Sequence, residues 1–149
     1  MHLIMSDAIE TTRIHDRQLP SNKSRSKYDS VEEYKKSNVR QKQYLDVCGS
    51  LAVKSPLTHK HGCIIVKGNK IISKGYNNKT NVYSESSIHA EIAALRKVKH
   101  LLDETCTMYV VRIGTPEQYA FKYSKPCATC ASMITKFKIR TVFYSVNSY

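Results

Sequence analysis

Apolar positions along the chain alternate between helical and strand spacing from about residue 31 onward. A stripe at helical spacing predicts a first helix that ends before Pro56. Its members are Tyr44, Val47, Cys48, Leu51 and Ala52. The same spacing predicts two more helices, over 88–102 and 127–137. Short β-branched and aromatic runs predict strands over 63–66, 70–73, 107–113 and 141–146.

The order of these elements predicts an α/β fold. A tight turn at 67–69 joins the first two strands into a hairpin. Two strand–helix–strand passages follow, which imply parallel neighbouring strands with right-handed crossovers. We therefore expect one mixed sheet of four or five strands with helices on both faces. In such sheets ligands bind where the strands end and the following helices begin.

The chain of 149 residues predicts a single domain over 31–149. Residues 1–30 have few periodic apolar positions and include a polar run at 21–27, which predicts a mobile N-terminal arm. The sequence stops just after the last predicted strand, so we expect an exposed sheet edge. A second copy of the chain can cover such an edge, and self-association is expected.

Composition and cysteine count narrow the class of protein. No stretch reaches the ~20 apolar residues of a membrane span, and no segment looks like a signal peptide. These features predict a cytoplasmic protein that does not act at a membrane. The chain has 5 cysteines, and this odd count does not indicate a disulfide framework. Reduced thiols or metal ligands are the better interpretation.

Two short motifs open the second and third predicted helices. His89 and Glu91 begin one helix, and Cys127 and Cys130 begin the other. Imidazole and thiolate groups are preferred zinc ligands, and three protein ligands leave a fourth position for water, as in catalytic zinc sites. A carboxylate two residues beyond the histidine is placed to move protons during attack by that water. Attack on a carbon that carries an exocyclic amine then expels ammonia.

The pattern His-x-Glu followed by Pro-Cys-x-x-Cys resembles the signature of the cytidine and deoxycytidylate deaminase superfamily. The resemblance covers residues 44–145 and includes 62–66 and 75–77, ahead of the histidine. It implies a cytidine deaminase-like fold and a zinc-dependent hydrolytic deaminase.

The resemblance also implies a role for each motif residue. His89, Cys127 and Cys130 are expected to bind Zn²⁺, and Glu91 is expected to be the catalytic proton shuttle. For the substrate, Asn77 matches the position that bonds a ribose hydroxyl, and the backbone of Ala90 matches the position that contacts the base edge.

The resemblance favours a cytosine nucleoside or nucleotide as substrate. Deoxycytidylate deaminases usually have Asn and Gly where this chain has Ala93 and Asn78. Residues 89–95 are similar to transfer-RNA adenosine deaminases, which usually differ from this chain at Lys125 and Thr129. Adenosine in transfer RNA is therefore the alternative substrate. A zinc-stabilised module that binds nucleic acid without turnover is the alternative outside enzymes.

Other interpretations of the same residues stay open. A closed structural zinc site needs a fourth ligand from Cys63, His61 or Cys106, and a Cys-x-x-Cys pair can be a redox motif. His59, His61 and Cys63 alternate along the chain and can hold a second metal. Asn77 can also be a simple turn residue.

The charge balance points to anionic partners without naming them. Lys and Arg number 24 against 12 Asp and Glu, a formal net charge of +12. Such a field attracts phosphorylated metabolites or nucleic acid, and it also promotes solubility. Lys79 and Lys125 lie nearest the motifs in sequence and are the first candidates for contact with a substrate phosphate.

Overall fold

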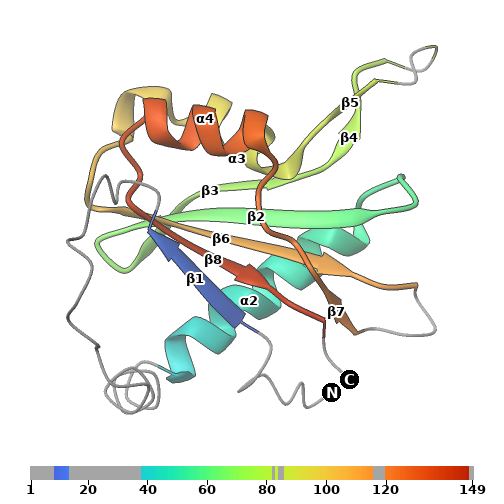
Figure 1. Cartoon of the computed structure of the whole chain (residues 1–149), viewed down its shortest axis with the longest axis horizontal. Helices are drawn as coiled ribbons and strands as arrows, with labels where there is room; N and C mark the ends of the chain where they lie inside the picture. Colours follow the sequence, from blue (N-terminus) through green and yellow to red (C-terminus); the bar gives the residue numbers. More distant parts are fainter. Residues whose placement is uncertain (1–8, 14–37, 82, 84–85, 116–119, 148–149) are drawn as a thin grey trace, which may run out of the picture.

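The computed structural model describes residues 9–13, 38–81, 83, 86–115 and 120–147. One central sheet separates a long helix on one face from two shorter helices on the other (Figure 1). The helices are α2 (Asn38–Val53), α3 (Ala90–Lys97) and α4 (Ala128–Lys136), with the 3-10 turn η1 (Lys99–Leu101) after α3. No helix in these ranges has the length and apolarity to cross a membrane.

The strands account for the remaining regular structure of the described residues. In chain order they are β1 (Ile9–Arg13), β2 (Lys60–Lys67), β3 (Lys70–Tyr76), β4 (Asn78–Lys79), β5 (Ser87–Ile88), β6 (Cys106–Ile113), β7 (Phe121–Lys122) and β8 (Thr141–Ser145). The main sheet has the order β1-β8-β6-β2-β3, with β7 paired to β6, and β4 with β5 forms a separate hairpin. The mixed α/β sheet with helices on both faces is as predicted.

The predicted parallel pairing is confirmed for one pair of strands and wrong for the other. β6 and β8 are parallel neighbours joined through α4. β3 and β6 run in the same direction, but β2 lies between them and pairs antiparallel with both. The reason is the tight β2–β3 hairpin, which leaves β3 at the edge, so the chain crosses over β2 before it enters β6.

The turn of that hairpin explains its tightness. Gly68 and Asn69 both have positive φ, at 56° and 62°. Two successive residues with positive φ form the two-residue turn whose twist matches the flanking strands. The hairpin predicted from the residues at 67–69 is confirmed.

β1 occupies the edge of β8 that was expected to be exposed. Ile9–Arg13 pairs antiparallel with Thr141–Ser145 along the whole of β8 (Figure 1). This part of the predicted arm is therefore a strand. Pairing needs only the backbone groups of a sheet edge, so the segment carries no strong apolar period. The rest of residues 1–30 lies outside the described residues, and a mobile arm there stays a prediction.

Two apolar clusters of described residues form the core, one on each face of the sheet. The cluster under α2 contains the predicted helical stripe, including fully buried Cys48. In it the ring of Tyr109 packs against Tyr44 and Phe143, with centroids 5.1 and 4.9 Å away. The cluster under α3 and α4 includes Cys63 and other small residues that allow the helices to approach the sheet.

Candidate zinc centre and active-site pocket

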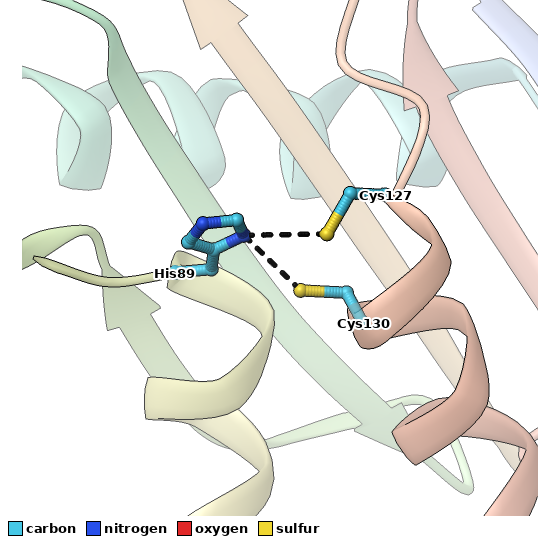
Figure 2. A group of neighbouring side chains, drawn as sticks. All are labelled: His89, Cys127 and Cys130. Carbon is cyan, nitrogen blue, oxygen red and sulfur yellow. Dashed lines mark hydrogen bonds between the residues drawn. The ribbon is translucent and has the colours of Figure 1, made fainter.

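The first residues of α3 and α4 bring the two sequence motifs together. His89 is the N-cap of α3 and Cys127 is the N-cap of α4, and both have extended backbone angles. In Figure 2 the Nδ1 atom of the His89 ring faces the sulfur atoms of both Cys127 and Cys130, which lie at the start of α4. A residue at an N-cap projects its side chain beyond the helix, so two adjacent helix starts can share one ligand.

α3 packs closely against β3, and this contact fixes the positions of His89 and Glu91. A Cβ built on Gly75 of β3 would lie 2.7 Å from the backbone nitrogen of Ala94 and 2.8 Å from the carbonyl oxygen of Ala90. The buried hydroxyl of Ser73 donates a hydrogen bond of 2.7 Å to the Ala94 carbonyl. Glycine at 75 and alanines along α3 therefore permit a backbone-to-backbone contact.

A pair of buried serines holds the segment that leads into Cys127. The Ser124 hydroxyl donates to the carbonyl of Val110, and the amide of Ser145 donates to the Ser124 oxygen at 2.8 Å. The Ser145 hydroxyl donates to the Lys122 carbonyl and accepts from the Arg112 amide. The predictions from the sequence did not include this network. A serine at a fully buried strand position is the signal that could have revealed it.

Three ligating atoms lie close enough to hold one metal ion. The Nδ1 atom of His89 is 3.6 Å from the Cys127 sulfur and 3.3 Å from the Cys130 sulfur, and all three atoms lie within 4.8 Å of one another. Tetrahedral zinc with bonds of about 2.1 Å to nitrogen and about 2.3 Å to sulfur separates these atoms by about 3.6 Å. The donor set and its spacing therefore fit zinc.

Burial opposes the thiolate form of Cys130. It raises the pKa of this thiol well above its usual value, and the nearby Glu91 carboxylate raises it further. A helix N-terminus by itself lowers the pKa of a thiol. At Cys130 burial outweighs that effect, so the thiolate needs a bound divalent cation to stabilise it.

Glu91 lies beside the ligands without belonging to their group. The residue is only 4% exposed, and its carboxyl accepts a hydrogen bond from the Cys130 thiol. Burial raises the pKa of Glu91 above its usual value. The predicted metal group contains His89, Cys127 and Cys130 but not this carboxylate.

A pocket of about 350 Å³ opens onto these residues, within the usual range for small-molecule sites. Five of the six predicted site residues line it, and Cys130 contributes to the adjoining groove between α3 and α4. The described lining residues are Leu57, Thr58, His59, His61, Asn77, Ser87, His89, Ala90, Glu91, Ser124, Lys125 and Cys127. A larger hollow of about 720 Å³, between α2 and the β2–β3 turn, contains none of the predicted site residues.

Asn77 has a scaffold role in addition to its place in the pocket. Its Oδ1 atom accepts from the His61 amide at 2.9 Å, and its Nδ2 group donates to the His59 carbonyl. An asparagine amide has two donor hydrogens and two acceptor lone pairs. These bonds use half of that capacity, so the predicted contact with a substrate hydroxyl stays a prediction.

His61 lines the pocket with an uncharged imidazole ring. Burial lowers its pKa to about 4, and positive charge on Arg112 contributes to the same shift. Lys125 also lines the pocket, whereas Lys79 is exposed on β4 outside the lining.

The alternative metal ligands do not join the group. Among the described residues, His89, Cys127 and Cys130 are the one set of three or more side chains that can hold an ion. Cys63 and Cys106 are buried in the core cluster under α3 and α4. Neither a fourth ligand nor the second metal at His59, His61 and Cys63 is formed by the described residues.

Comparison with known proteins agrees with this geometry. Residues 39–146 match the family described as the cytidine and deoxycytidylate deaminase zinc-binding region. No curated protein sequence matches the chain significantly. Among solved structures, a dCMP deaminase from the cyanophage S-TIM5 aligns with a TM-score of 0.50 at 18% identity, over 66% of this chain and 76% of that one.

Two further solved structures are also similar. RibD from Acinetobacter baumannii aligns at a TM-score of 0.49 and 22% identity, over 67% of this chain and 26% of its own. A cytidine deaminase from Burkholderia pseudomallei aligns at 0.49 and 19%, over 62% of this chain and 72% of its own. The family match extends from α2 to the end of β8 and contains both motifs, so the chain belongs to the zinc-binding cytidine and deoxycytidylate deaminase family.

Proposed function

We propose that the protein is a zinc-dependent hydrolytic deaminase that converts a cytosine nucleoside or nucleotide to its uracil form and releases ammonia. The observation that supports this most is the buried Glu91 carboxyl in the same pocket as His89 and Cys127. A structural zinc site has no need of a carboxylate that is not a ligand. A hydrolytic site needs one to move protons.

The proposed ligands are His89, Cys127 and Cys130. Zinc held by these three side chains would lower the pKa of a bound water to about 7, so that hydroxide would be available as the nucleophile near neutral pH. Glu91 accepts the proton released by that attack and delivers it to N3 of the cytosine ring. Glu91 then takes the second proton of the same water, from the new hydroxyl group on C4, and passes it to the departing amine. The bond from C4 to oxygen forms and the bond from C4 to N4 breaks, so one water is consumed and one ammonia leaves.

The start of α3 offers groups that can orient the base. The first amides of a helix have no partner within the helix, and Ala90 is the first residue of α3 and lines the pocket. Its backbone is therefore available to the base edge, as the family resemblance implies. The remaining donor and acceptor capacity of Asn77 supports a contact with the sugar.

The decisive experiment on the mechanism is Glu91→Gln in zinc-loaded protein. The amide keeps the shape of the side chain but cannot carry the proton, so ammonia release should fall by about 10²–10⁴-fold while zinc content is unchanged. Glu104→Gln is the matched control, because Glu104 lies in an exposed ion pair with Arg140. Near-parental release by Glu91→Gln contradicts the mechanism, and loss of zinc would make Glu91 a ligand.

A substrate panel tests the class of compound. Cytidine, deoxycytidine, their 5′-monophosphates, single-stranded DNA and transfer RNA are incubated with the zinc-loaded protein, and ammonia and the uracil or inosine product are measured. We expect release from free cytosine compounds. Inosine from transfer RNA alone would establish the adenosine alternative, and zinc binding without any release would establish a non-catalytic module. A cytoplasmic location and self-association stay predictions.

A further inference from the structure

Arg112 is a cation next to the pocket with no carboxylate partner among the described residues. It lies near the end of β6, directly across from His61 on β2, and its side chain is half-buried. Its Nε atom is buried and has no hydrogen-bond partner within the described part of the chain. The ion pairs there join Lys67 to Asp103 and Arg140 to Glu104. A guanidinium is suited to carboxylate or phosphate, so Arg112 lacks the kind of partner it usually has.

The contact that Arg112 does make fixes the proton on a pocket histidine. Its Nη2 group lies 2.7 Å from Nδ1 of His59, which lines the pocket. A guanidinium has donors only, so Nδ1 of His59 must accept. A ring nitrogen that accepts carries no proton, so the ring proton of His59 is on Nε2. Arg112 therefore holds His59 as a hydrogen-bond donor through the ring nitrogen that faces away from the guanidinium.

Positive charge prevails on this part of the pocket wall. Lys125 is exposed and lines the pocket in the segment before Cys127. Glu91 is the one acidic side chain among the described lining residues, and the proposed function already uses it as the proton carrier. This part of the pocket therefore presents the ammonium group of Lys125 and a hydrogen-bond donor on the His59 ring, and the Arg112 guanidinium lies next to that ring. Among the described lining residues, no acidic side chain pairs with these groups.

We propose, on the basis of the proposed function, that this pocket accepts a nucleoside 5′-monophosphate, whose phosphate is bound by Lys125 and His59, with Arg112 as the positioning residue that orients His59. The geometry assigns to Arg112 and His59 a role that the sequence motifs do not indicate. The proposed phosphate site also selects between the two substrate classes of the proposed function, because it favours nucleotides over nucleosides.

A free monophosphate fits this wall better than a phosphate within a nucleic acid strand. A phosphate monoester carries nearly two negative charges at neutral pH and three terminal oxygens, and two cations are at hand. A phosphodiester carries one charge and two terminal oxygens, and its strand must continue on both sides. The pocket of about 350 Å³ is small for more than one nucleotide.

The test measures binding of reaction products, so it does not depend on turnover. Zinc-loaded protein is titrated calorimetrically with uridine and deoxyuridine 5′-monophosphates, with the corresponding nucleosides, and with a single-stranded deoxyuridine oligonucleotide that lacks a terminal phosphate. Of the two monophosphates, we expect the one that binds more tightly to exceed its own nucleoside in affinity by at least about tenfold. The reason is that hydrogen bonds from Lys125 and His59 to a charged phosphate are charge-assisted and therefore strong.

The variants separate contact from positioning. His59→Ala and Lys125→Gln, both at exposed positions, should each weaken monophosphate binding about tenfold and leave nucleoside binding unchanged. Arg112→Gln should have the same selective effect, and Arg112→Lys should recover part of it, because lysine can still donate to Nδ1. Lys74→Gln is the charge-matched control, because Lys74 is exposed on the edge strand β3 and lies outside the pocket.

The outcomes distinguish this proposal from the proposed function. Equal affinity for nucleoside and monophosphate, an equal loss of both in the variants, or an equal loss in Lys74→Gln overturns the phosphate site. Tighter binding of the oligonucleotide overturns the choice of a free nucleotide. If the monophosphate binds selectively but no cytosine compound releases ammonia, the phosphate site stands and the proposed reaction fails. If cytidine and its monophosphate are deaminated with equal efficiency and bind equally, the reaction stands and the phosphate site fails.

Discussion

Gly75→Ala tests whether the close packing of α3 against β3 positions the candidate zinc ligands. The new Cβ would lie 2.7 and 2.8 Å from backbone atoms of Ala94 and Ala90, where ordinary contact begins at 3.4 Å. The α3 backbone must therefore withdraw by about 0.6–0.7 Å, because neither atom belongs to a flexible side chain. His89 begins this helix, so its ring moves relative to the two thiols of α4.

The expected cost follows from two opposing effects. Overpacking of a well-packed core costs about 1–3 kcal/mol. Replacing glycine lowers the entropy of the unfolded chain and offsets about 0.4–1 kcal/mol of that. We therefore expect a net loss of about 1–2 kcal/mol in the free energy of unfolding. Displacement of a supported ligand typically weakens metal binding by about 10–100-fold, and we expect a loss of zinc affinity in that range.

Urea unfolding at constant free zinc measures the stability, and competition with a chromogenic chelator measures the zinc affinity. Gly68→Ala is the control, because Gly68 has φ of +56° and a Cβ added there would meet no atom within 4 Å. Strain of about 1–2 kcal/mol is expected there without any change in zinc affinity. Parental zinc affinity in Gly75→Ala, or an equal loss in both variants, would refute the link between this contact and the metal site.

Three further predictions address the metal, the serine network and the pocket histidine. Cys127→Ser and Cys130→Ser should each abolish stoichiometric zinc in elemental analysis, because a neutral hydroxyl replaces a thiolate, and retained zinc would remove these ligands from the site. Ser145→Ala leaves the Arg112 amide and a carbonyl on β7 without their partner and should lower the free energy of unfolding in urea by about 2–4 kcal/mol; an unchanged midpoint would contradict the network. Burial lowers the pKa of His61 from 6.5 to about 4 in the folded state. The neutral ring therefore contributes its full stability above pH 6.5, and this contribution is lost as the pH falls from 6.5 to about 4. This loss is at most about 3 kcal/mol, and the pH profile of His61→Gln should lack it; identical profiles would contradict the buried neutral ring.

Local patterns in the sequence determined the elements and the motif residues. The spacing of apolar positions located α2, α3 and α4, because burial of one helical face imposes that period. Gly68 and Asn69 marked the β2–β3 turn, because a two-residue hairpin requires positive φ. His89 and Cys127 were predicted at helix starts, and both are N-caps in the structure.

Strand order and the environment of each side chain were decided only by the tertiary structure. The pairing of Ile9–Arg13 with β8 depends on backbone groups, which have no side-chain signature. The contact between Arg112 and His59 joins residues 53 positions apart, and the Ser124–Ser145 contact joins residues 21 positions apart. At Cys130 the helix start favours a thiolate and burial disfavours it, and burial is a property of the whole packed core that no local pattern of residues specifies.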